Sequence, residues 1–251
     1  MSTHRFTVTV GAGEVAGVLH LPETAAGAHP SNRGATYPCI VACHGMGASK
    51  ASDKYLLMGQ ELPAAGLALA RFDFRGSGES TGLHRDATIE TRVADLEAVL
   101  DHLAKRPQLD GRFGLLGSSL GGYVALWAAS RGVGGAALPV VTWNAPASLR
   151  ELPDVDPNEA GQALVAEVER GGWAVAPAGV ARVLVVQAER DEVVPPSHGR
   201  ALFERAREPR RLHVIAGADH RLTETSHRQE ALEESRRWLS AHLPPPARGA
   251  A

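Results

Sequence analysis

Six short runs rich in valine, leucine and isoleucine recur along the chain, and they constrain the fold more than any other feature. Continuous apolar runs bounded by turn residues are typical of parallel strands that are covered on both faces. Helical patterns lie between these runs, and the alternation predicts an α/β fold with a doubly wound, mostly parallel sheet of about eight strands. The runs are residues 39–44, 67–74, 113–118, 137–143, 182–188 and 211–217.

The remaining elements follow from periodicity and turn signals. The segments RFTVTV and VAGVLHLP near the N-terminus have the pattern of an antiparallel strand pair. Apolar residues at helical spacing predict a helix from about Thr88 to Lys105, and a second helix begins within SLGGYVALWAAS and ends near Gly132. A last helix is expected from about Ser226 to His242, because Ser226 and Gln229 have the spacing of a capping box.

We expect one domain over residues 1–251, since no linker or internal repeat divides the chain. The strand pattern lapses over residues 145–180, where NEAGQALVAEVERGG is helical and flanked by prolines. This segment is predicted to be a small cap insertion over one end of the sheet. The last residues, PPPARGAA, are expected to form a frayed tail.

Composition excludes several classes of partner. The 26 basic and 28 acidic residues give a net charge of −2 and form no block of like charge, so neither nucleic acid nor an anionic membrane is an expected partner. The first residues lack the pattern of a signal peptide, and no stretch reaches the roughly 18 apolar residues of a membrane span. A cytoplasmic protein is therefore expected. Cys39 and Cys43 are expected to be buried thiols, with no metal site.

The stretch GLLGSSLGGY, Gly114 to Tyr123, places two serines at a predicted strand-to-helix turn. The pattern G-x-S-x-G fits it in one register, with Ser119 at the centre and Gly117 and Gly121 on either side. Such a sharp turn projects its central side chain above the carboxyl edge of the sheet, which predicts that Ser119 and not Ser118 is a nucleophile. The alternative is a glycine-rich turn with a hydrogen-bonded serine.

A serine nucleophile needs an imidazole base and a carboxylate that orients it. Asp191 and His220 follow the last two predicted strands, in the order in which this kind of fold supplies an acid and a base. Glu189 and Glu192 are nearby alternatives for the acid. A surface histidine remains the alternative for His220, whereas His213 and His227 lie inside a predicted strand and helix.

Acyl transfer also needs donors for a developing oxyanion. One is the backbone N–H of Leu120, the residue after the predicted nucleophile. The second is expected from the loop CHGMGASK, where the N–H of Met46 is the candidate. The His44 ring is expected to brace this loop.

The motifs HGMGASK, ARFDFRGSGES, GLLGSSLGG, QAERDEVVP and GADH follow one another in this order. In them the chain resembles the α/β-hydrolase superfamily, and in particular small bacterial serine carboxylesterases related to cinnamoyl and feruloyl esterases. By this resemblance Ser119, Asp191 and His220 match the catalytic triad, and Met46 and Leu120 match the oxyanion hole. The run RFDFRGSGES lacks the spacing of a nucleotide-binding glycine motif. Asp73 and Arg75 in this run are instead expected in a structural polar network near the site.

The expected substrate is a small carboxylic ester, and no cofactor is required. Compared with cinnamoyl esterases the insertion is short and has no tyrosine, which favours a modest apolar acyl pocket. Trp143 and Trp173 are candidate substrate-binding walls of that pocket, and core packing is their alternative role. Cleavage of an amide or thioester by the same triad, or a non-catalytic binding protein on this fold, remains open. The sequence does not predict an oligomeric state.

Overall fold

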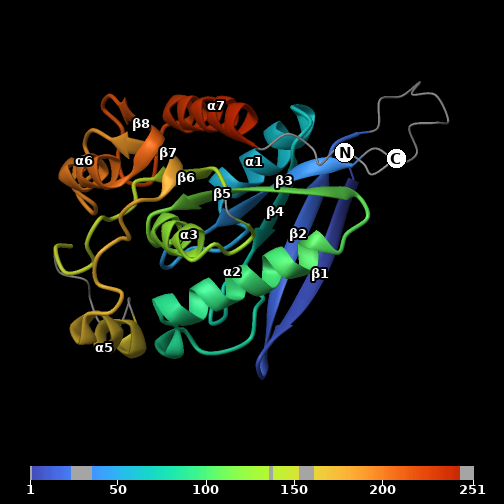
Figure 1. The fold of residues 1–251 in the computed structure, drawn as a ribbon, viewed down its shortest axis with the longest axis horizontal. Coiled ribbons are helices and arrows are strands. Elements are labelled where there is room, and N and C mark those ends of the chain that lie inside the picture. Colours follow the sequence, from blue (N-terminus) through green and yellow to red (C-terminus); the bar gives the residue numbers. More distant parts are fainter. Residues whose placement is uncertain (1, 24–35, 136–137, 153–160, 244–251) are drawn as a thin grey trace.

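A single twisted sheet of eight strands runs through the molecule in the order β1-β2-β4-β3-β5-β6-β7-β8 (Figure 1). The computed structural model describes residues 2–23, 36–135, 138–152 and 161–243. The strands are β1 (Ser2–Val10), β2 (Gly13–Leu21), β3 (Tyr37–Cys43), β4 (Ala68–Phe72), β5 (Leu109–Ser118), β6 (Val140–Trp143), β7 (Ala181–Ala188) and β8 (Arg207–Ile215).

One strand, β2, runs opposite to all the others in the sheet. β1 pairs antiparallel with β2, and β2 pairs antiparallel with β4, whereas β4, β3, β5, β6, β7 and β8 are parallel to one another. The predicted doubly wound sheet and its N-terminal antiparallel pair are therefore confirmed. The carboxyl ends of the parallel strands all meet at one edge, which is where such sheets carry their ligands.

Helices cover both faces of the sheet (Figure 1). Neighbouring residues of a strand point to opposite faces: Ile40 packs in the apolar cluster formed with α1 and α7, while Val41 packs in the cluster with α2, α3 and α6. Strands buried on both sides must be apolar throughout, which explains the continuous runs in the sequence. These helices are α1 (Asp53–Ala64), α2 (Ile89–Ala104), α3 (Leu120–Ser130), α6 (Pro196–Arg205) and α7 (Thr225–His242).

The capping box predicted for α7 is wrong. The N-cap residue is Glu224, which makes no side-chain capping bond, and Ser226 lies inside the first turn. The preceding turn sets this boundary: the Asp219 carboxylate accepts hydrogen bonds from the Thr223 N–H at 2.7 Å and from its hydroxyl at 2.5 Å. The chain therefore enters the helix two residues earlier than the spacing of Ser226 and Gln229 suggests.

Two different capping devices close the start of α2. Thr88 and Thr91 form a reciprocal capping box there. In addition, the carboxylate of Glu167 accepts hydrogen bonds from the N–H groups of Ile89 at 2.6 Å and Glu90 at 3.1 Å. Glu167 belongs to α5 (Gln162–Arg170), so this contact fastens the helix of the predicted insertion to the main body.

Part of the predicted insertion is described. Ser148 and Val175 form an isolated antiparallel bridge on either side of α5. Residues 153–160 of the insertion and the predicted tail, residues 244–251, lie outside the described residues.

Both cysteines are buried free thiols at strand β3, and burial raises the pKa of each. This agrees with the expectation from the sequence. None of the helices in the described ranges is both long and apolar enough to cross a membrane.

Glu167→Ala removes the only acceptors that α5 supplies to the first turn of α2, so we expect the free energy of unfolding to fall by about 1–3 kcal/mol. Glu169→Ala, an exposed residue on the same helix, is the matched control and is expected to change it by less than about 0.5 kcal/mol. Urea unfolding of both variants measures the difference. Equal losses would show that the Glu167 contact does not hold the insertion to the body.

Candidate functional site

Ser119 lies at the tight turn between β5 and α3, in a backbone conformation that non-glycine residues rarely adopt. Its φ is 53° and its ψ is −126°, and its N–H donates a hydrogen bond to the carbonyl oxygen of Trp143 at 2.7 Å. Strained backbone of this kind persists only where the surrounding structure enforces it, and it is concentrated at functional sites. Ser118, by contrast, is the last residue of β5 and is 3% exposed.

Glycines make this turn possible, because strand and helix approach too closely for side chains. A Cβ on Gly117 would lie 2.3 Å from the carbonyl oxygen of Gly121. A Cβ on Gly121 would in turn lie 2.1 Å from the carbonyl oxygen of Cys43, at the end of the neighbouring strand β3. The pattern G-x-S-x-G is thus required by packing between β5, α3 and β3.

Asp191 and His220 lie in the loops after β7 and β8, at the same edge of the sheet as Ser119. The Nδ1–H of His220 donates to Oδ2 of Asp191 at 2.7 Å. Asp191 is buried, and its Oδ1 accepts the N–H groups of Val193 at 3.0 Å and Val194 at 2.7 Å. These bonds fix the carboxylate, and with Nδ1 as the donor the acceptor nitrogen of a neutral ring is Nε2. The Ser119 hydroxyl forms no hydrogen bond within the described residues.

The two glutamates considered as alternatives to Asp191 make other contacts. The Glu189 carboxylate accepts the N–H of Gly217 at 2.8 Å, so it shapes the loop that carries His220. Glu192 is exposed. Among the three acidic residues, Asp191 is the one within hydrogen-bond distance of the imidazole.

Asn144, which sequence reasoning missed, joins the parts of the site. It follows β6 with a φ of 53°, and its side-chain oxygen accepts the N–H of Ala188 at 2.7 Å. Its side-chain nitrogen donates to the carbonyl oxygen of His220 at 2.8 Å. The Asn144 side chain therefore links the end of β7 to the loop that carries His220, the histidine loop. The sequence offered one local indication of this role. Asparagine tolerates a positive φ, and here it directly follows a predicted strand.

The loop after β3 lies against Ser119. A Cβ on Gly45 would lie 3.1 Å from the Cβ of Ser119 and 3.8 Å from its Oγ, so the Gly45 backbone contacts this residue directly. Neither the Met46 N–H nor the Leu120 N–H donates a hydrogen bond to any group in the described ranges. Both amides therefore keep an unused donor in the described structure.

His44 holds this loop from within the core, as the sequence led us to expect. Its Nε2 accepts the N–H of Phe74 at 3.1 Å, so the proton resides on Nδ1, which donates to the carbonyl oxygen of Gly45 at 2.7 Å. The ring also packs edge-on against Phe74 with 5.0 Å between centroids. Burial lowers the pKa of His44 to about 4.

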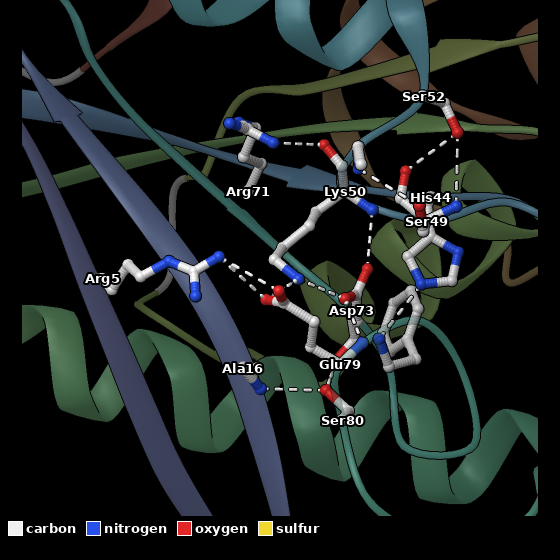
Figure 2. Close-up of polar contacts among 12 residues, drawn as sticks. Arg5, Ala16, His44, Ser49, Lys50, Ser52, Arg71, Asp73, Glu79 and Ser80 are labelled. Atoms are coloured by element: carbon white, nitrogen blue, oxygen red, sulfur yellow. Dashed lines mark hydrogen bonds and ion pairs between the residues drawn. The ribbon is translucent and has the colours of Figure 1, made fainter.

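A buried ion pair anchors the far end of the same loop (Figure 2). Asp73 is fully buried and accepts both the backbone N–H of Lys50, at 2.7 Å, and its ammonium, at 2.5 Å. The Lys50 ammonium also contacts Glu79, at 2.7 Å, and Glu79 pairs with Arg5 on β1. Arg71 donates to the Lys50 carbonyl oxygen at 2.6 Å. The loop between β3 and α1 is thereby fixed at several points.

Arg75 belongs to a second network. Its backbone N–H and its Nε both donate to the carboxylate of Asp95 on α2, at 2.9 and 2.5 Å. The glycine-rich run after β4 therefore forms a rigid loop tied to α2 by Arg75 and to the loop after β3 by Asp73. It is a structural connection, as the sequence predicted.

The side chains of the two tryptophans pack within the protein, although the Trp143 backbone contacts Ser119 through its carbonyl oxygen. Trp143 is fully buried beneath α7, and its indole N–H donates to Ser235 Oγ at 2.9 Å, so it is a core residue and the expected pocket wall is wrong for it. Trp173 packs against Trp127 of α3 with 4.6 Å between ring centroids. Trp127 is eight residues beyond Ser119, which is about 12 Å along the helix, so a substrate-binding role for Trp173 stays a prediction.

Asp73→Asn leaves the buried Lys50 ammonium without its main counter-charge, and we expect a loss of about 3–5 kcal/mol in the free energy of unfolding. Glu79→Gln removes the half-exposed member of the same network and is expected to lower it by less than about 1 kcal/mol. Chemical denaturation of the two variants tests the contrast. Similar losses would mean that the buried pair does not anchor the loop.

His44 is expected to remain neutral in the native protein down to about pH 4. Because its folded pKa is lowered from 6.5, the unfolded chain binds this proton first, and the stabilisation present above about pH 6.5 is lost as the pH falls through about 4. Nitrogen NMR of the labelled imidazole follows the titration directly. A midpoint near 6.5 in the folded protein would contradict the burial of a neutral ring.

Sequence similarity to known proteins covers most of the chain. A family model described as serine aminopeptidase, S33, matches residues 34–146, which include the loop after β3 and the Ser119 turn. An uncharacterised protein of Mycobacterium tuberculosis is 27% identical over 217 residues, covering 84% of this chain and 73% of that protein.

Solved structures match the whole fold. Est1E from Butyrivibrio proteoclasticus, solved with bound ferulic acid, superposes with a TM-score of 0.69 at 20% identity, covering 94% of this chain and 98% of that one. The mouse α/β hydrolase domain-containing protein 10 gives 0.74 at 17% identity, covering 95% and 99%. At these identities the likeness concerns the fold alone. In fold the chain is similar to the α/β hydrolases, and its residues 34–146 match the serine aminopeptidase family model.

Proposed function

We propose that this protein is a serine hydrolase that cleaves small carboxylic esters through an acyl-enzyme, with Ser119, His220 and Asp191 as its catalytic triad. The observation that carries the proposal is the hydrogen bond of 2.7 Å between His220 and the buried Asp191, at the sheet edge where Ser119 occupies a strained turn. An imidazole held by a carboxylate, at the same sheet edge as a serine in a strained strand-to-helix turn, fits the arrangement that acyl transfer requires.

In the proposed mechanism the Ser119 hydroxyl attacks the ester carbonyl while Nε2 of His220 takes its proton. Asp191 accepts the Nδ1–H throughout, which holds the tautomer and stabilises the imidazolium. The amides of Met46 and Leu120 donate to the oxyanion of the tetrahedral intermediate. His220 then protonates the departing alcohol, and a water activated by the same imidazole releases the acid from Ser119.

A fluorophosphonate probe tests whether the serine is activated. We expect the label on Ser119, located by mass spectrometry of the modified peptide, and no label in the Ser119→Ala variant. Ser118→Ala is the adjacent control and is expected to keep the label. A label on Ser118, or no label on folded protein, would reject the mechanism.

Asp191→Asn is expected to lower kcat toward a small aryl ester by about 10⁴-fold, because the amide favours the wrong imidazole tautomer. Glu192→Gln, a nearby exposed residue, serves as the control and is expected to lose less than about twofold. If turnover survives the change at Asp191 and collapses on replacing Glu189 or Glu192, the acid has been misassigned.

Amide cleavage by the same residues is the second candidate, favoured by the family model named for serine aminopeptidases. A nitrophenyl ester and a nitroanilide of one acyl group separate the two, since they share the acyl-enzyme and differ in the leaving group. A thioester of that acyl group extends the comparison to the third leaving group considered.

A further inference from the structure

A lysine lies beside the nucleophile without belonging to the proposed triad. Lys54 is in the first turn of α1, and its ammonium donates a hydrogen bond to the Ser118 hydroxyl at 2.9 Å. Ser118 immediately precedes Ser119. The adjacent Tyr55 is buried and donates to the carbonyl oxygen of Cys43, at the end of β3, which fixes this turn of α1 against the sheet edge.

The ammonium of Lys54 lacks an ion-pair partner within the part of the chain that the structure describes. Among the described residues its ammonium forms no ion pair, and its one hydrogen bond is to a neutral hydroxyl. Burial, and after it the charges of Arg221 and Arg228, lower the pKa of Lys54 to about 8, against the opposite influence of Asp219 and Asp191. A partly buried cation that faces two further cations is destabilising on its own, and such arrangements are concentrated at binding sites.

Packing of α1 places Lys54 on the side of the loop that carries His220. α1 packs against α7, the helix that follows this loop. Ala218 and Leu222, which stand two residues before and after His220, are completely buried in the same apolar cluster as Tyr55. Arg221 follows the histidine directly, and Arg228 lies in the first turns of α7, where its guanidinium donates to Thr225 Oγ1 at 3.2 Å. Lys54 and the two arginines therefore come from neighbouring segments, and the charges of both arginines act on Lys54.

The proposed proton transfer from His220 indicates which part of the substrate lies near these cations. The departing alcohol oxygen must receive its proton from His220, so the alcohol portion of the ester lies over the histidine loop. The acyl portion extends away from that imidazole. Cations grouped around the histidine loop are thus positioned to meet the alcohol portion.

We propose that Lys54, together with Arg221 and Arg228, forms a subsite for a carboxylate or similar anion on the alcohol portion of the ester. The proposal rests on the proposed function and names its substrate class. An incoming anion would supply the counter-charge that the Lys54 ammonium lacks, and it would bring an ester carbonyl toward Ser119. Esters whose alcohol portion is anionic are therefore expected to be preferred over neutral esters of the same shape.

Matched synthetic esters test this preference. 4-Carboxyphenyl butyrate and its amide isostere, 4-carbamoylphenyl butyrate, differ in the charge of the alcohol portion, while 4-carbamoylphenyl hemisuccinate carries its charge on the acyl portion. For Lys54→Met we expect the ratio of kcat/KM between the carboxyphenyl and carbamoylphenyl butyrates to fall about tenfold from its wild-type value, mainly through KM.

Lys105→Met is the matched control, because it removes the same charge from an exposed position at the C-terminal end of α2. β5 begins shortly after Lys105 and ends at the nucleophile, so this lysine lies at the opposite edge of the sheet. The ratio is expected to be unchanged in this variant.

The pH dependence tests the same subsite without a substitution. Since the Lys54 cation is present below its pKa of about 8, the wild-type preference for the carboxyphenyl ester is expected to fall as the pH rises through that value. The carboxylate stays ionised over this range. Lys54→Arg is expected to retain the preference above about pH 8, because a guanidinium keeps its charge.

The outcomes separate the two proposals. An unchanged ratio in Lys54→Met, or a loss that appears with the hemisuccinate and not with the carboxyphenyl ester, would overturn the subsite while leaving the hydrolase intact. If the wild-type protein cleaves none of the three esters and takes up no fluorophosphonate, the proposed function fails, and the subsite with it.

Discussion

The close approach of β5, α3 and β3 is the constraint on which the remaining structure depends. Gly121 leaves no space between α3 and the carbonyl oxygen of Cys43, and Gly117 leaves none between β5 and α3. With side chains at these positions the turn would open, and Ser119 would lose both its strained backbone and its place against the Gly45 loop. The apolar strands on either side hold the turn closed because they are buried on both faces.

Polar groups in the core then position the loops around that turn. His44 fixes the loop after β3 at one end and the Lys50–Asp73 pair fixes it at the other, while Asn144 fastens the histidine loop. Each group has its hydrogen-bond partners in place before any substrate arrives. Such preorganisation is what makes backbone amides effective toward a developing charge, because they need not reorient during the reaction.

Lys54 differs from these groups, because its ammonium forms no ion pair among the described residues. Lys50 lies four residues earlier and is paired with Asp73 and Glu79, whereas Lys54 donates to a serine hydroxyl and experiences the charges of two arginines and, more weakly, of Asp219 and Asp191. One lysine therefore contributes to the architecture of the loop, and the other keeps its charge available for a ligand. This contrast within a single loop and helix start is the basis for assigning the substrate an anionic group.

The sequence by itself determined the strands, their doubly wound arrangement, and the turns after β5, β7 and β8 at which Ser119, Asp191 and His220 lie, because hydrophobic periodicity and glycine spacing are local properties. Only the tertiary structure decided which side chains meet. Lys54 contacts Ser118 across 64 positions and Glu167 caps α2 across 78, and no local pattern encodes either contact. The start of α7 was misjudged for a related reason: the Asp219 turn, and not the capping spacing of Ser226, sets it. Trp143 was misjudged as well, because its direction depends on the helix packed above β6.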